Sequence, residues 1–158
     1  MLRIHSRRRH KSKTMMTTWV PDSETILKVF VDNLILKDKK ERCLQQLIHP
    51  QKRRKFTDRL SHKLDSVLNM KYLQPFDAQV DGMQEIQKLL TLKKNEACYI
   101  ISDINENDDL LLPFEDIFEN VFSRISFATI IMNTSGNRFF LQTEASKDGT
   151  SRFIGIRI

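Results

Sequence analysis

The stretch Ala97-Cys98-Tyr99-Ile100-Ile101-Ser102 carries the clearest strand signal in this chain. Its three consecutive large apolar residues, Tyr99 to Ile101, are typical of a strand that is covered on both faces. An acidic loop at 103–109 follows, and Pro113 then suits the first turn of a helix over 113–122. Apolar residues recur in that helix at three- and four-residue spacing, which indicates one face packed on a core.

Three further strands are predicted after this helix, over 127–134, 138–144 and 152–158. Ser135-Gly136-Asn137 and Lys147-Asp148-Gly149 are the turn signals that separate them. The residues between 102 and 127 are numerous enough for a right-handed crossover, which would make the strands at 97–102 and 127–134 parallel.

The part of the chain before residue 96 is predicted to be mostly helical. Four helices are expected, beginning at Asp22 or Ser23, at Asp38, at Pro50 and at Asp81, with the third covering 50–69 and the fourth ending near Lys93. Each has apolar residues at helical spacing on one face. Asp38 followed by Glu41 resembles a capping box at the start of the second helix, and residues 72–75 are expected to form a linker.

The predicted fold is therefore α+β. About four N-terminal helices occupy 19–95, and a β-α-β-β-β unit with a four-stranded mixed or antiparallel sheet occupies 96–158. Because no long linker rich in Pro, Gly or Ser divides the chain, 19–158 is expected to be a single domain. Residues 1–18 are expected to be a disordered basic tail.

The composition is that of a soluble protein, with 40% apolar residues and a mean hydropathy of -0.42. No apolar run approaches the roughly 20 residues that a membrane-spanning helix needs, so no membrane association is predicted. The N-terminus has no apolar segment of the kind found in signal peptides. Cys43 and Cys98 are far apart and form no disulfide or metal-binding pattern. These features predict a cytoplasmic protein, or a nuclear one in a nucleated cell.

The net charge of +6 is carried entirely by the first 15 residues, which contain six bases and no acid. Met15 and Met16 follow this segment directly, so the true start is predicted to be Met1, Met15 or Met16. The rest of the chain is polarised: residues 16–75 have twelve bases and seven acids, and residues 76–158 have eight bases and thirteen acids. This asymmetry favours a dipolar molecule over a uniformly basic one.

No pattern of catalytic or cofactor-binding residues is evident, and no cofactor, metal or catalytic residue is predicted. The four glycines are scattered, whereas a phosphate-binding loop needs several close together. The acidic loop begins like a calcium loop but has Asp108 and Phe114 where glycine and glutamate are required. One enzymatic alternative remains, a two-carboxylate site in this loop that combines Asp103 with Glu106 or Asp108. Cys98 and Cys43 are interpreted as apolar core residues.

The one positive signal is a basic stripe on the third predicted helix, formed by Lys52, Lys55, Arg59 and Lys63. At about 100° per residue, these bases lie beside the apolar face that contains Phe56. Such a stripe is often only a solvated helix face. It also suits an acidic protein partner, where charge steers the encounter, or a nucleic-acid backbone.

These observations predict a non-enzymatic protein that binds a macromolecule, with nucleic-acid binding through helix 50–69 and a small enzyme around loop 103–109 as alternatives. The binding hypothesis predicts a basic patch without a deep cleft, and the enzyme hypothesis predicts a polar pocket beside the acidic loop or Cys98. A third interpretation is that the bases at 51–63 pair with the acids at 103–119, within the fold or between copies. Internal pairing of the bases would remove the main support for nucleic-acid binding.

Overall fold

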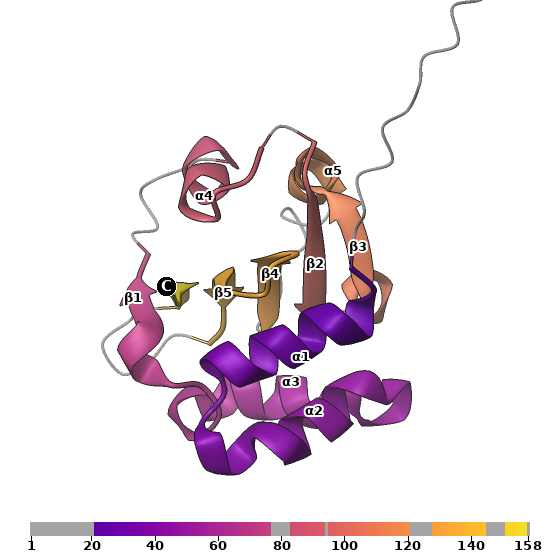
Figure 1. The fold of residues 1–158 in the computed structure, drawn as a ribbon, viewed down its shortest axis with the longest axis vertical. Helices are drawn as coiled ribbons and strands as arrows, with labels where there is room; N and C mark the ends of the chain where they lie inside the picture. Colours follow the sequence, from indigo (N-terminus) through magenta and orange to yellow (C-terminus); the bar gives the residue numbers. More distant parts are fainter. Residues whose placement is uncertain (1–20, 77–82, 94, 121–127, 145–150, 158) are drawn as a thin grey trace, which may run out of the picture.

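The computed structural model describes residues 21–76, 83–93, 95–120, 128–144 and 151–157 (Figure 1). The predicted tail at 1–18 and the predicted turn at 147–149 lie outside these residues. Within them the chain forms an antiparallel sheet of six strands with helices on both faces. This confirms the α+β class.

The strands follow the order β1-β6-β5-β4-β2-β3 across the sheet. Their bounds are β1 Leu73–Pro75, β2 Ala97–Ser102, β3 Leu110–Pro113, β4 Thr129–Asn133, β5 Arg138–Gln142 and β6 Arg152–Ile156. The four strands predicted from the sequence are β2, β4, β5 and β6. The turn between β4 and β5 is as predicted. Gly136 adopts a φ of 64° in this turn, which favours glycine, and a Cβ added to it would lie only 3.0 Å from the Phe30 nitrogen.

Two strands were not predicted, and both lie at the edges of the sheet. β1 was expected to be a linker, and β3 falls between the acidic loop and the predicted helix. Both are short and contain a proline, Pro75 in β1 and Pro113 in β3, and proline is tolerated at sheet edges because no ladder hydrogen bond is needed there.

Of the mixed and antiparallel sheets left open by the sequence, the structure has the antiparallel one, and the crossover that would make the strands at 97–102 and 127–134 parallel is not formed. β2 and β4 are antiparallel neighbours, with Ile101 opposite Ile130. The chain first turns back along β2 as β3, with Leu112 opposite Cys98, and then forms α5 before it enters β4. The intervening residues are therefore a strand and a helix, and not a crossover connection.

Helices α1 (Ser23–Leu34), α2 (Lys40–Ile48) and α3 (Arg53–His62) cover one face of the sheet, and α4 (Met83–Leu89) and α5 (Phe114–Asn120) cover the other (Figure 1). Tyr99 and Ile101 point into the first core, and Cys98 and Ile100 point into the second. The continuous apolar run of β2 thus reflects a strand buried on both sides, as predicted.

The helix starts and ends differ in part from the prediction. Asp22 caps α1 by accepting a hydrogen bond of 2.8 Å from the Thr25 nitrogen, as expected. The predicted capping box at Asp38 is wrong, because a 3-10 turn at Lys37–Lys39 precedes α2 and no side chain caps the helix. The fourth helix is shorter than predicted, since α4 covers Met83–Leu89.

The third helix ends at His62, and not near residue 69. The Thr143 hydroxyl, after β5, donates to the carbonyls of Leu60 and Ser61 at 3.1 and 3.0 Å, which occupies acceptors that the end of a helix leaves unsatisfied. The chain then returns to the end of α1, where the Asn69 nitrogen donates to the Leu34 carbonyl at 2.9 Å. Among the described helices, none has both the length and the apolar character to cross a bilayer.

Candidate functional site

Arg53, at the start of α3, is a polar group between the helical layer and the sheet that donates four hydrogen bonds. Its residue exposure is 5%, so the guanidinium is buried. The Arg53 Nε donates to Asp108 Oδ2 at 2.5 Å, and a second nitrogen donates to Asp108 Oδ1 at 2.6 Å. This two-point contact matches the planar fork of the guanidinium to the carboxylate. The predicted attraction between the basic segment and the acidic loop therefore exists within the fold, through Arg53.

The remaining contacts of Arg53 connect three further parts of the chain. Its Nη1 donates to the Leu47 carbonyl at 2.7 Å, at the end of α2, and to the Tyr99 hydroxyl at 3.2 Å, in β2. Tyr99 in turn donates its hydroxyl proton to Asp109 Oδ1. One side chain thus ties α2, α3, β2 and the turn before β3 together, which fixes the acidic loop against the helical layer.

The charges of this cluster do not cancel, because one guanidinium faces two carboxylates. Burial lowers the pKa of the Arg53 guanidinium, but the hydrogen bonds and charge of Asp108 outweigh burial, and the net shift is upward. Burial raises the pKa of the Tyr99 phenol, and the Asp109 bond adds to this against the opposing charge of Arg53. Asp109 lies at 4.0 Å from Arg53 Nη1 with a half-exposed carboxylate. Since Asp108 neutralises Arg53, Asp109 leaves the cluster with a surplus of negative charge.

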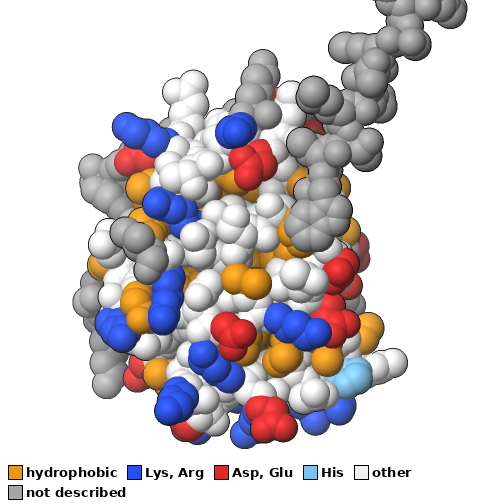
Figure 2. Space-filling model, viewed as in Figure 1, with side chains coloured by type: hydrophobic (Ala, Val, Ile, Leu, Met, Phe, Trp, Pro, Cys, Tyr) orange, Lys and Arg blue, Asp and Glu red, His pale blue; other side chains and the backbone are white. Residues whose placement is uncertain are grey.

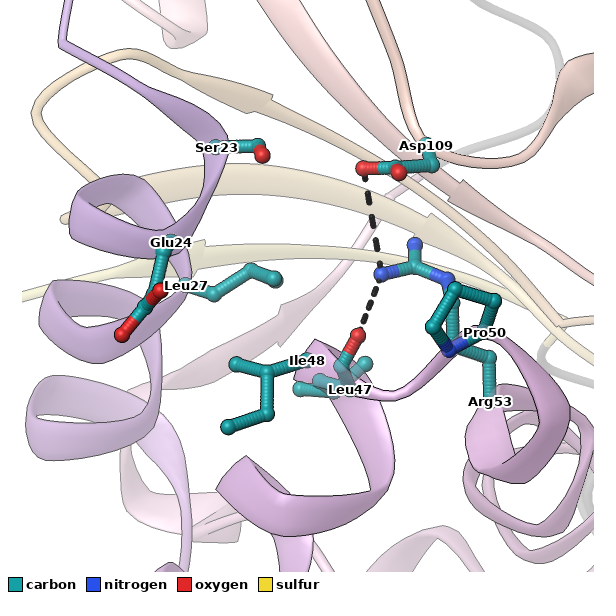
Figure 3. A pocket seen from close by; sticks show the side chains of 8 residues that line it. All are labelled: Ser23, Glu24, Leu27, Leu47, Ile48, Pro50, Arg53 and Asp109. Atoms are coloured by element: carbon teal, nitrogen blue, oxygen red, sulfur yellow. Dashed lines mark hydrogen bonds and ion pairs between the residues drawn. The ribbon is translucent and has the colours of Figure 1, made fainter.

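A pocket of about 130 Å³ opens beside this cluster (Figure 3). It lies between the first turn of α1, the end of α2 and the 3-10 turn at Pro50–Lys52. The lining residues are Ser23, Glu24, Leu27, Leu47, Ile48, Pro50, Arg53 and Asp109. Cavities of about 150 Å³ hold a benzene-sized molecule, whereas substrate sites typically occupy about 300–1,000 Å³. The pocket therefore has room for only a small ligand or one side chain.

The residues of the enzymatic alternative are not brought together in this pocket. Of the acidic loop, only Asp109 lines it; Asp103 and Glu106 are exposed elsewhere on the loop, and Asp108 bonds Arg53. Cys98 lies in the second core, where burial raises its pKa to about 12. Burial also raises the pKa of Cys43, in the first core. Both thiols are thus held protonated, which is the less nucleophilic form.

The four bases of the predicted stripe are here called the α3 basic face: Lys52, Lys55, Arg59 and Lys63. The three lysines are exposed, and no acidic side chain within the described ranges forms an ion pair with them. Arg59 is half-buried, donates to the Gln46 amide oxygen and lies 3.9 Å from Cys43 Sγ. It therefore lies against α2 and has less freedom to reach a partner than the lysines have.

Sequence reasoning did not single out Arg53, although a signal for it exists. Arg53 precedes Phe56 by three residues and Leu60 by seven, and both of these are fully buried. This spacing puts Arg53 on the core face of the helix, whereas Lys52 and Lys55 fall outside it. In the run of four bases at 52–55, the periodicity of the neighbouring apolar residues thus identifies the base that is buried.

Within the part of the chain that the structure describes, no group of three or more His, Cys, Asp or Glu side chains is placed to hold a metal ion. Comparison of the chain with protein families, with curated proteins and with solved structures found no match.

Proposed function

We propose that this chain is a non-enzymatic interaction protein that binds an acidic surface of a partner protein through the α3 basic face. The observation that carries the proposal is the contrast within one run of bases. Arg53 is buried and neutralised by Asp108, whereas Lys52 and Lys55, on the same turn of chain, are exposed with no ion pair to a described residue. The lysine charges are thus available to a partner.

The charge distribution favours a protein partner over a nucleic acid. The six bases of residues 1–15 account for the whole net charge of +6, and residues 16–158 carry 20 bases and 20 acids. On the face shown in Figure 2, basic side chains alternate with acidic ones and form no broad field of one sign. Proteins that bind a nucleic-acid backbone commonly make about 6–10 phosphate contacts, more than the α3 basic face supplies. Electrostatic steering toward a complementary protein surface needs fewer charges.

Two further features support this proposal over the enzymatic alternative. The pocket beside Asp109 is smaller than typical substrate sites, and it contains neither cysteine nor histidine among its lining residues.

The test compares two triple charge reversals in the full chain. The first changes Lys52, Lys55 and Lys63 to Glu; the matched control changes the exposed lysines Lys37, Lys88 and Lys93 to Glu, with the same change in net charge. The probe is a fluorescent oligoglutamate peptide, titrated by anisotropy at several salt concentrations. At about 0.2–1 kcal/mol per lost exposed contact, the first variant should bind at least roughly threefold more weakly than the control.

Two outcomes count against the proposal. Equal loss of affinity in both variants would show that net charge, and not the α3 basic face, attracts the peptide. A DNA duplex that binds more tightly than the peptide at equal salt, with the loss confined to the first variant, would favour the nucleic-acid alternative. Both measurements are repeated with the six bases of residues 1–15 changed to Gln, so that this segment does not mask the difference.

A further inference from the structure

We propose that the pocket beside Arg53 binds a primary ammonium group on a short apolar chain, as found in a small alkylamine or in the side chain of a partner's lysine. Lys52 of the α3 basic face lies in the 3-10 turn beside this pocket but does not line it, and the pocket takes a ligand of the opposite charge.

The pocket is lined by four apolar residues and four polar or charged ones. Leu27, Leu47, Ile48 and Pro50 supply the walls, from three different segments of the helical layer. Figure 3 shows the Ser23 side chain and the Asp109 carboxylate facing each other across the opening. An amphipathic side chain with an apolar stem and a charged head suits this combination of apolar side chains and a carboxylate.

The buried Arg53 does not make this an anion site. A guanidinium has five N–H donors. Four of those of Arg53 are used, two by Asp108, one by the Leu47 carbonyl and one by the Tyr99 hydroxyl. An incoming anion would find the positive charge neutralised and would lie near Asp109, which is 4.0 Å from the guanidinium. Like charges at such distances repel, so anions are disfavoured.

Asp109 shares Arg53, at 4.0 Å, with Asp108, which binds the same guanidinium through both of its oxygens, so the three side chains together carry one net negative charge. The other pocket carboxylate, Glu24, forms an ion pair with Lys28 at 2.7 Å. The Oδ1 atom of Asp109 accepts from Tyr99, and its Oδ2 atom has no partner among the described residues. Asp109 also holds a φ of 58°, a conformation that aspartate and asparagine tolerate better than most residues. The backbone thus holds in the pocket lining a carboxylate oxygen that has no hydrogen-bond partner among the described residues.

The test uses three probes that share a four-carbon stem and differ in the head group: n-butylamine, butyrate and 1-butanol at pH 7. Each is titrated into the isotope-labelled full chain, and amide shifts are followed by NMR. We expect saturable binding of n-butylamine with a Kd on the order of 1 mM, typical of so small a ligand. The shifts should cluster at Ser23, Leu47 and Asp109, and the other two probes should bind at least about tenfold more weakly.

The variant Asp109→Asn removes the charge while it keeps a hydrogen-bond acceptor for Tyr99 and tolerates the same φ. It should weaken n-butylamine binding about tenfold or more. The matched control is Glu106→Gln, which removes an exposed carboxylate from the same loop but not from the pocket, and which should leave binding unchanged. Lys63→Glu, in the α3 basic face but not in the turn beside the pocket, should weaken oligoglutamate binding and leave n-butylamine binding unchanged, so failure of this proposal is distinguishable from failure of the proposed function.

Equal binding of butyrate and n-butylamine, shifts that fall away from the pocket, or equal affinities of the Asp109→Asn and unmodified chains would each overturn the proposal. The source of the ammonium group is addressed with N-acetyl-lysine amide. If this probe binds more tightly than n-butylamine, the flanking peptide groups are recognised and the ligand is a lysine of a partner. If it binds more weakly, the ligand is a free alkylamine.

Discussion

Replacing Arg53 by methionine tests whether one buried ion pair holds the acidic loop to the helical layer. Methionine keeps an unbranched apolar stem of similar width and removes all the guanidinium donors. Asp108 would then lose both Arg53 hydrogen bonds and keep the bond of 3.0 Å from the Ser102 nitrogen. The Leu47 carbonyl would also lose its 2.7 Å partner.

The magnitude follows from the burial of the pair. The side-chain exposures of Arg53 and Asp108 are 6% and 17%, so solvent screens this ion pair much less than it screens a pair on the surface. Removing one partner of a buried pair leaves an uncompensated charge, which costs about 3–5 kcal/mol. Domains of this size are stable by only about 5–15 kcal/mol in total. Arg53→Met should therefore remove a large part of the free energy of unfolding.

The assay is urea denaturation followed by far-UV circular dichroism. The matched control is Arg54→Met, one residue along: its side chain is 88% exposed, and its ion-pair contact with Asp58 is 4.0 Å long. That substitution should change the free energy of unfolding by no more than about 0.5 kcal/mol. Adding Asp108→Asn to each completes a double-mutant cycle, in which Arg53 and Asp108 should show a coupling of about 0.5–3 kcal/mol, and Arg54 and Asp108 none.

Equal loss of the free energy of unfolding in Arg53→Met and Arg54→Met would contradict this prediction. Simple additivity of the effects of Arg53→Met and Asp108→Asn would also contradict it. In the first case the burial of Arg53 would have no energetic consequence, and in the second the two charges would not stabilise each other.

Two further predictions concern the sheet and alkaline pH. Gly155→Ala should destabilise the fold by about 1–3 kcal/mol or more, because a Cβ there would lie 1.9 Å from the Phe139 ring. A thermal or urea melt measures this loss. The double variant Gly155→Ala with Phe139→Leu should recover part of it. Because burial raises the pKa of Tyr99 above its ordinary 10.0, the folded chain holds the phenol proton more tightly than the unfolded chain does. The contribution of the neutral Tyr99 phenol to the free energy of unfolding is therefore complete below about pH 10. It is lost as the pH rises further, at up to about 1.4 kcal/mol per pH unit. In urea melts at graded pH, Tyr99→Phe should flatten this slope.

The central part of the sheet could be predicted from the sequence because its strands are long and apolar. β2 has the predicted bounds, Ala97–Ser102, and its run of buried residues needs no tertiary information to be recognised. The edge strands β1 and β3 could not be predicted in this way, because strands of three and four residues with a proline have no periodicity to detect. The antiparallel position of β4 beside β2 depends on long-range pairing, which a local pattern does not encode.

The candidate site was predictable only in its parts. Lys52, Lys55 and Lys63 are exposed, as a stripe beside the core face requires. Arg59 departs from this, because its guanidinium reaches the Gln46 amide on α2, a contact that depends on how two helices pack. The pocket combines residues from the start of α1 with Asp109, which are far apart in the sequence. No spacing rule within one segment connects them.

The geometry of the α3 segment separates charges that serve the fold from charges that are available to a partner. Successive residues of a helix are rotated by about 100°, so Arg53 points inward to Asp108 while its neighbours in the basic run point to solvent. Substitutions there should consequently divide into two groups. Changes at Arg53 should lower stability and thereby affect every property of the chain, whereas changes at Lys52 or Lys55 should weaken binding of an acidic partner and leave the urea midpoint almost unchanged. A basic segment kept for the fold alone would not contain this second group, so the two measurements together distinguish a solvated helix face from a binding surface.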